Sequence, residues 1–409
     1  MKQIRKPLSL MCALAVMLAA LCVPGLAQSA IFDGGSGTAE DPWQIATAEQ
    51  LAAFAASVND GSQSGYAGQA IVLTQDIDLS GVEWTPIGNM NDMEGYTTLF
   101  LGSFDGQGHT VSNLTYETDA FICGAGLFGI SVGEIKNVNM ANAIVICTEG
   151  TSQAIAALVG YNMGSVSGCS VSGARVTGNA CVGGVIGGNM GSVTNCAISD
   201  AVVTVIGDND FSEGLVQCDI AECGGLIIGG GFGGTIDGCT ASGTVQAEGV
   251  EPVGLGGIGG CLEMMDSVAN CTADVTIVSA QGGHAIGGLC GYAGTHSNGQ
   301  IAAESEGIVA TQYPSIIENC TVSVKIDAPE ATHVGGLVGT GLYYFGEETA
   351  FAVRNCTVSG EISAVTPGAI AGRAEGCTIE NCSADVTANG AALEDLVGTT
   401  DRMYESADQ

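Results

Sequence analysis

The chain has 409 residues, of which 43 are acidic and only nine are lysine or arginine, so its formal net charge is −34. A field of that sign repels nucleic acids and anionic membranes, which excludes both as expected partners. The 46% content of hydrophobic residues is too high for a disordered chain, and the 64 glycines follow no collagen period. We therefore expect a large folded protein with many turns and closely stacked backbones.

Residues 1–29 predict a secretory signal peptide. Three basic residues precede an apolar run from 8 to 23, which is short for the ~20 residues of a membrane span. A retained N-terminal anchor is the alternative. Without the signal, six basic residues oppose 43 acidic ones, a net charge of −37. We expect a secreted or cell-surface protein that does not insert into a membrane after the signal is removed.

A short amphipathic helix is predicted next. Thr47 and Gln50 have the spacing of a capping box at a helix start, and Asn59-Asp60-Gly61 ends the pattern. The apolar residues between them fall on one helical face: Leu51, Phe54, Ala55 and Val58. We interpret this helix as a cap over the structure that follows. A partner-binding helix is the alternative.

From residue 113 onward, one residue pair recurs in similar settings. The pairs are Asn113-Leu114, Asn137-Val138, Gly168-Cys169, Asn195-Cys196, Gly238-Cys239, Asn270-Cys271, Asn319-Cys320, Asn355-Cys356 and Asn381-Cys382. Their first member is always Asn or Gly, the residues that tolerate a left-handed backbone, so each repeat is expected to make the same turn with φ > 0. The side chains of stacked asparagines can also form hydrogen bonds from one coil to the next. The second member is followed by period-two alternation, as from 320 to 328, which indicates a strand with one buried face.

A second half-motif recurs in register with these pairs. Its apolar anchor falls at 127, 158, 185, 226, 258, 289, 337 and 370, mostly 27 to 33 residues apart and flanked by Gly or Ala. Two short strands per ~30 residues cannot form an independent core, so successive repeats must stack. No helical period lies between the strands. The sequence therefore predicts an all-β fold, a right-handed parallel β-helix (β-solenoid) with a short N-terminal capping helix.

The half-motif, as in Gly336-Leu337-Val338-Gly339, resembles the GLUG motif of bacterial surface proteins. The resemblance extends to Glu40-Asp41-Pro42-Trp43 and to Phe104-Asp105-Gly106. Such proteins include repeat regions of immunoglobulin-A-cleaving metalloendopeptidases and adhesin-like proteins. The resemblance implies a β-helix at the cell surface. It does not imply proteolysis, because none of the four histidines begins the zinc signature His-Glu-x-x-His. We divide the chain into the signal (1–29), the cap and first coils (30–116), the GLUG-type repeats (117–398) and a tail (399–409).

Seven cysteines occupy the second position of the recurring pair, so they should form one inward column. Side chains of in-register parallel neighbours point the same way, ~4.8 Å apart, a geometry that suits a disulfide poorly. We expect buried free thiols there. Cys218–Cys223 and Cys377–Cys382 are looser disulfide candidates. A zinc site is not expected, because paired Cys-x-x-Cys sets are absent and the histidines are scattered.

The sequence shows no recognisable catalytic site. Asp208 and Asp210 open an imperfect calcium loop and are weak metal candidates, with a solvated acidic loop as the alternative. No metal site is assigned and no cofactor is expected. A β-helix carbohydrate-active enzyme would need carboxylates that converge on one face.

The favoured hypothesis is a non-catalytic, adhesin-like interaction protein that presents loops on a rigid solenoid to a host or cell-surface glycan or protein. A structural stalk or spacer is the second hypothesis, and the carbohydrate-active enzyme is the third. Two insertions, beginning at Tyr292 and Leu342, should leave the solenoid at the same corner of adjacent coils. The candidate ligand-binding residues are their aromatic and histidine side chains: Tyr292, His296, Tyr313, Tyr343, Tyr344 and Phe345.

Overall fold

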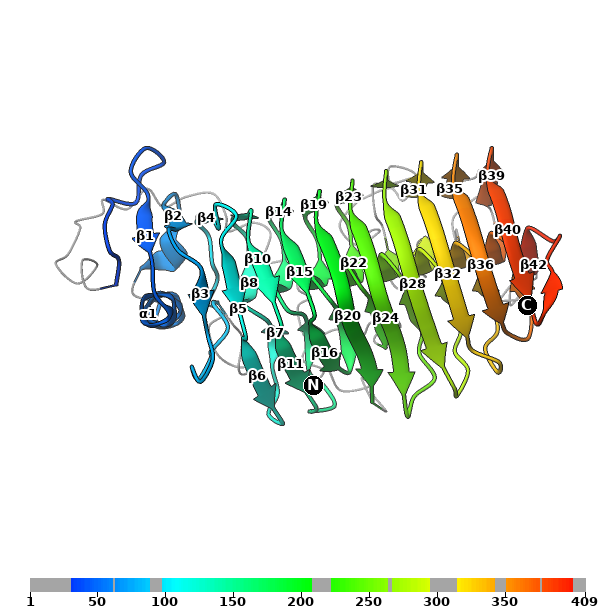
Figure 1. The fold of residues 1–409 in the computed structure, drawn as a ribbon, viewed down its shortest axis with the longest axis horizontal. Coiled ribbons are helices and arrows are strands. Elements are labelled where there is room, and N and C mark those ends of the chain that lie inside the picture. Colours follow the sequence, from blue (N-terminus) through cyan, green and yellow to red (C-terminus); the bar gives the residue numbers. More distant parts are fainter. Residues whose placement is uncertain are drawn as a thin grey trace, which may run out of the picture.

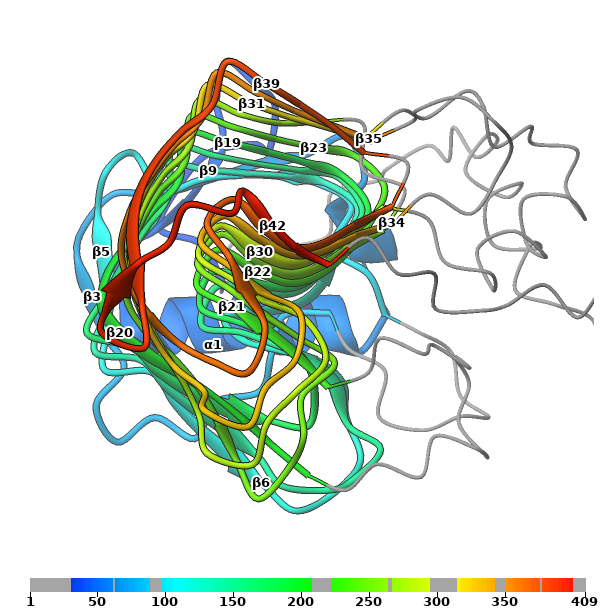
Figure 2. The ribbon, with the colours of Figure 1, turned by 90° about the vertical axis from the view of Figure 1, so that its right-hand side faces the viewer.

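The computed structural model describes residues 31–61, 63–88, 98–207, 222–263, 267–294, 315–342, 351–375 and 377–399. They wind into an elongated parallel β-solenoid, with the N-terminal coils at one end and the C-terminal coils at the other (Figure 1). Four sheets run along its length, and we number them in the order in which each coil visits them. In Figure 2, seen from the C-terminal end, the chain passes counter-clockwise while it advances toward the viewer, so the predicted right-handed winding is confirmed.

Sheet 1 forms one outer wall of the solenoid. Most of its strands place one buried apolar residue between two outward-facing neighbours, as in Glu134-Ile135-Lys136, where Ile135 is fully buried. Its strands are β1 (Trp43–Ile45), β2 (Ala70–Leu73), β4 (Ser103–Asp105), β9 (Glu134–Lys136), β14 (Ser165–Ser167), β19 (Ser192–Thr194), β23 (Thr235–Asp237), β27 (Ser267–Ala269), β31 (Ser315–Glu318), β35 (Phe351–Arg354) and β39 (Cys377–Glu380).

Sheet 2 forms the adjoining wall and holds the longest strands. Its early coils carry two short strands that later merge into one, and the predicted alternation is confirmed by β32, whose burial strictly alternates. Its strands are β3 (Ile77–Asp78), β5 (Thr110–Ser112), β6 (Thr115–Thr118), β10 (Asn139–Ala141), β11 (Ile144–Cys147), β15 (Ser170–Ser172), β16 (Arg175–Gly178), β20 (Ala197–Ile206), β24 (Thr240–Glu248), β28 (Thr272–Ser279), β32 (Thr321–Asp327), β36 (Thr357–Ser363), β40 (Ser383–Ala388) and the antiparallel β41 (Ala391–Ala392).

Sheets 3 and 4 lie inside the outline drawn by the other two and meet at a sharp bend (Figure 2). Sheet 3 contains β7 (Cys123–Ala125), β12 (Gln153–Ile155), β17 (Ala180–Gly183), β21 (Cys223–Gly225), β25 (Gly254–Gly256), β29 (Ile286–Gly287), β33 (Val334–Gly335) and β37 (Pro367–Gly368). Sheet 4 contains β8 (Phe128–Ser131), β13 (Val159–Asn162), β18 (Ile186–Asn189), β22 (Ile228–Phe232), β26 (Gly259–Glu263), β30 (Cys290–Gly294), β34 (Val338–Leu342), β38 (Ala371–Glu375) and β42 (Val397–Thr399).

The expectation of two strands per repeat was therefore wrong, because a full coil such as β23 to β26 contains four. The recurring half-motif spans the bend between sheets 3 and 4. Its apolar anchor points into the core, and Leu127, Leu289 and Leu337 are fully buried. Its glycines permit the two sheets to touch. A Cβ on Gly260, for example, would lie 2.5 Å from the amide nitrogen of Gly224 in the preceding coil. Close backbone packing thus explains the glycine content of the chain.

The nine predicted left-handed turns are all confirmed. Each first member of the recurring pair has a positive φ, between 52° at Asn195 and 65° at Gly238. The asparagines also bond along the stack, since Asn355 donates from Nδ2 to Oδ1 of Asn319, and Asn319 donates in the same way to Asn270, each over 3.3 Å. These bonds use side chains that the left-handed turn holds in line.

We expect Asn355→Ala to lower the free energy of unfolding by about 1–2 kcal/mol, because an alanine at φ 53° is strained. Asn355→Gly is the matched control. Glycine also lacks the side-chain amide but tolerates the turn, so this variant should lose clearly less free energy of unfolding. Urea unfolding followed by circular dichroism measures both values. Equal losses in the two variants would assign the effect to the side-chain hydrogen bond instead of the backbone.

The seven paired cysteines form the predicted inward column, and all are free thiols. Six are almost fully buried, while Cys382 in the last coil is half-buried. Each thiol lies near the carbonyl oxygen two residues earlier, at 3.2 Å for Cys271 and 3.5 Å for Cys196. Contact with the neighbouring Cys196 thiol and burial raise the pKa of Cys169, which disfavours the reactive thiolate.

Among the looser disulfide candidates, Cys377 and Cys382 are both free thiols, which contradicts that pairing. Cys223 is likewise a free thiol, and its proposed partner Cys218 lies outside the described residues. The Cys223 thiol lies 3.8 Å from Sγ of Cys181, too far for a disulfide bond.

We expect the column to resist labelling by N-ethylmaleimide in the native protein and to react after denaturation. Cys382 should react before the other six, because it alone is half-buried. Mass spectrometry of labelled peptides, sampled over time, resolves each position. Fast native labelling of Cys196 or Cys271 would contradict a closed core.

The predicted cap is confirmed. Helix α1 (Ala48–Asn59) begins at Thr47, whose side chain accepts from the Gln50 amide while the Gln50 side chain accepts from the Thr47 amide. Its buried face carries Phe54, which packs against Tyr66 of the 3-10 helix η3 (Ser64–Tyr66) with ring centroids 5.0 Å apart. The helix covers the first coils (Figure 1), which shields their strand edges.

Candidate functional site

Most of the sequence-predicted site residues lie outside the described part of the chain. These are the calcium candidates Asp208 and Asp210 and the insertion residues His296, Tyr313, Tyr343, Tyr344 and Phe345. Their roles stay predictions. Within the described residues, no group of three or more His, Cys, Asp or Glu side chains could hold a metal ion.

Tyr292 is described, and its predicted place in a surface insertion was wrong. It lies within strand β30, and only 5% of it is exposed. Its ring belongs to a small second core formed with Cys181, Cys223 and Cys261, apart from the main core. A residue this well buried packs the fold and does not offer its ring to an external ligand.

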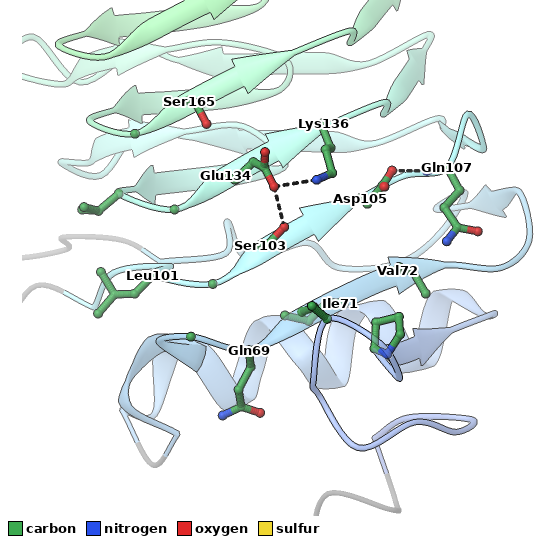
Figure 3. Close-up of a pocket in the computed structure, with 18 residues that line it drawn as sticks. Gln69, Ile71, Val72, Leu101, Ser103, Asp105, Gln107, Glu134, Lys136 and Ser165 are labelled. Carbon is green, nitrogen blue, oxygen red and sulfur yellow. Dashed lines mark hydrogen bonds and ion pairs between the residues drawn. The ribbon is translucent and has the colours of Figure 1, made fainter. Parts of the chain in front are cut away.

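A groove on the outer face of sheet 1 is the strongest candidate site among the described residues. It has a volume of about 720 Å³ and lies near the capped end, over β2, β4, β9 and the start of β14. Figure 3 shows its polar side chains, which come from neighbouring coils: Gln69, Ser103, Asp105, Gln107, Glu134, Lys136 and Ser165. Parallel register places them together, because Ser103 pairs with Glu134, and Glu134 with Ser165.

Glu134 and Lys136 form the centre of the groove. The Lys136 Nζ lies 2.6 Å from the Glu134 Oε2, and Ser103 Oγ donates to the same oxygen over 2.8 Å. The hydrogen bonds from Lys136 and Ser103 hold the pKa of Glu134 below its usual range. This carboxylate therefore stays ionised at neutral pH. A glycosidase general acid needs the opposite, a carboxyl whose pKa is raised.

Two further polar groups are held in place at the rim. One oxygen of Asp105 accepts from the amide of Gln107 over 2.8 Å and from the Asn137 side chain over 3.0 Å. The Gln69 side-chain oxygen accepts from the indole of Trp43 over 2.7 Å. Fixed acceptors and amides on a rigid sheet are suited to orienting a polar ligand.

The sequence prediction missed this groove. A usable signal exists, since Gly133-Glu134-Ile135 and Gly164-Ser165-Val166 repeat one pattern in which the middle residue must face outward. Lys136 is also one of only six lysine and arginine residues after residue 29. The repeated pattern becomes visible only when the coils are aligned by register.

Comparisons with known proteins agree with this architecture. The family model of the GLUG motif matches residues 330–363 and 363–389. A solved structure from Bacteroides ovatus, provisionally named an immunoglobulin A1 protease, superposes with a TM-score of 0.53 and covers 87% of each chain. At 18% identity, this likeness shows the shared fold alone.

Two sequence relatives match part of the chain. Halomucin of Haloquadratum walsbyi is 34% identical over 172 residues, and a protein of Evansella cellulosilytica, provisionally named a Gly-rich membrane protein, is 33% identical over 171 residues. Each match covers 39% of this chain but only 2% and 18% of the respective relative. None of the described helices is long and apolar enough to cross a bilayer. The chain therefore carries two matches to the GLUG motif in its C-terminal coils, within a β-solenoid similar to that of the solved structure.

Proposed function

We propose that this chain is a non-catalytic, adhesin-like interaction protein at the cell surface or outside the cell, where its solenoid holds a ligand in the sheet 1 groove. The groove is the observation that carries the proposal, because rigid neighbouring strands fix charged and polar side chains in one concave site. The predicted signal and the names of the relatives support an extracellular location.

Binding fits the site better than catalysis. Lys136 and Ser103 both donate to Oε2 of Glu134 and lower the pKa of this carboxyl, which does not suit the role of a general acid. The stalk hypothesis accounts for the rigid fold but gives no reason for a polar groove. The expected ligand is a host or cell-surface glycan or protein.

A double variant tests the groove. We expect Glu134→Gln with Lys136→Gln to weaken binding of the protein's ligand at least tenfold on glycan and matrix-protein arrays, because the central ion pair is lost. Arg354→Gln with Glu380→Gln is the matched control. It removes a 3.1 Å ion pair from the far end of the solenoid and should bind normally.

If the ligand does not bind in the groove, a second pair of variants locates its binding site. Normal binding by the groove variant, together with lost binding when residues 295–314 and 343–350 are replaced by short glycine-serine linkers, would move the site to the predicted insertions. Those linkers leave β30, β34 and β35 intact, so unfolding of the solenoid is not expected to cause the loss.

A further inference from the structure

A row of exposed apolar side chains runs along the corner between sheets 4 and 1. Its members are one coil apart and are 36% to 45% exposed: Leu101, Val132, Met163 and Met190. Only two other large apolar residues in the described chain are exposed to this degree, Val365 and Leu396. Four of these six exposed apolar residues therefore lie at one corner of the solenoid and form a distinct surface feature. We call this row the apolar ladder.

The backbone fixes the ladder in register. The Val132 amide donates to the Phe100 oxygen over 2.9 Å, and the Met190 amide donates to the Asn162 oxygen over 2.7 Å. A glycine follows each member and packs against the coil before it. A Cβ on Gly164, for example, would lie 2.1 Å from the carbonyl oxygen of Gly133. The ladder side chains therefore point outward from a corner that cannot rearrange.

A buried polar pair stiffens the middle of the ladder. The Asn162 side chain donates to the Asn189 side chain over 2.7 Å, and both residues are fully buried. Asn162 also accepts from the amide of Gly164, which follows Met163. The ladder stops after Met190, because Phe232 at the same position of the next coil is only partly exposed and packs on the second core.

The ladder continues directly into the groove. Leu101 and Val132 line the groove beside Ser103 and Glu134, and Figure 3 shows Leu101 at its edge. The first residues of the strands after Met163 and Met190 are again polar, namely Ser165 and Ser192. An apolar strip and a polar strip thus run side by side along the solenoid axis.

We propose that the groove and the apolar ladder together bind a neutral, chain-like glycan that lies along the solenoid axis. This inference rests on the proposed function and names its ligand class. A sugar ring presents an apolar face beside hydroxyl edges, which matches the two strips. The coils rise by ~4.8 Å each, so successive ladder members meet successive ring faces.

Charge and backbone bonding decide between this ligand and others. The net charge of −34 repels acidic polymers, and the groove's own cation, Lys136, is paired with Glu134. An extended peptide would bind by adding a strand to free backbone groups. The amides of Val132, Met163 and Met190 already donate to neighbouring coils, so the ladder offers no such edge.

The test uses the full chain without residues 1–29 and graded oligosaccharides, from disaccharide to hexasaccharide, of β-linked glucose, N-acetylglucosamine, xylose and mannose. Calorimetry should show affinity rising with length in at least one neutral series. Met163→Gln with Met190→Gln should weaken hexasaccharide binding about tenfold and leave the affinity for the shortest bound oligomer unchanged. Val365→Thr with Leu396→Gln is the control, because those side chains are 56% and 46% exposed elsewhere and should not matter.

Several results would overturn the inference. The first two are binding to none of the neutral oligosaccharides and tighter binding to polygalacturonate. The third is a ladder variant whose affinity still rises with oligosaccharide length as in the wild type. The fourth is a protein ligand that the ladder variant no longer binds. The proposed function fails separately, through the Glu134→Gln and Lys136→Gln variant. If that variant loses the ligand while the ladder variant keeps it, the groove stands and the ladder does not.

Discussion

Gly291→Ala is expected to lower the free energy of unfolding by about 3 kcal/mol or more, because the added methyl group has no space. Its Cβ would lie 2.5 Å from the Leu255 amide nitrogen and 2.6 Å from the carbonyl oxygens of Ala285 and Gly260. All three are backbone atoms of strands or turns that cannot move without separating sheets 3 and 4. The urea midpoint of the variant, read by circular dichroism, measures the loss.

Gly249→Ala is the control for this prediction. Gly249 has a φ of +76°, and nothing lies within 4 Å of the position that a Cβ would take. Alanine there should cost about 1 kcal/mol from backbone strain alone. If the two variants were equally stable, close packing of the bend would not be the reason for the glycines of the half-motif.

Phe54→Ala is expected to destabilise the capped end by about 3–5 kcal/mol, since it leaves a cavity in an aromatic cluster. The Phe54 ring centroid lies 5.0 Å from that of Tyr66, 6.0 Å from that of Phe100 and 6.1 Å from that of Phe104. Hydrogen exchange should rise in β1, β2 and β4 before it rises in the C-terminal coils, because a solenoid transmits stability mainly between neighbours.

Loss of the cap should also promote self-association of the protein. Displacing α1 exposes the edge of the first coil, so light scattering of the variant should increase with concentration and time. Ala56→Ser on the exposed side of the same helix is the control, with an expected change within about 0.5 kcal/mol. A Phe54→Ala protein as stable and monodisperse as the control would show that the helix does not act as a cap.

Local sequence was sufficient to predict the structure wherever one residue type decides a backbone conformation. Asn355 and Gly238 could be assigned to left-handed turns because few other residues tolerate positive φ. Thr47 and Gln50 could be assigned to a helix start because their side chains bond within four residues. The same holds for the inward direction of Cys320, which follows from strict alternation along β32.

Sheet 3 was missed because its strands carry no such signal. Strands such as β25 (Gly254–Gly256) and β29 (Ile286–Gly287) are two or three residues long and buried on both faces. Period-two alternation of apolar and polar residues is lost when both faces of a strand are buried, and glycine in a sequence usually predicts a turn. The buried position of Tyr292 was missed for the same reason, since β30 continues past the half-motif without alternation.

The turn conformations, the buried columns, the cap and hence the β-solenoid follow from local residue patterns. Which outward side chains become neighbours depends on how the coils pack on one another. Ser103, Glu134 and Ser165 are each about thirty residues apart in the chain, as are Leu101, Val132 and Met163. Their meeting depends on the register between coils, which the packing of all four sheets sets together. Outward residues do not contribute to that packing, so no local pattern marks them as one site.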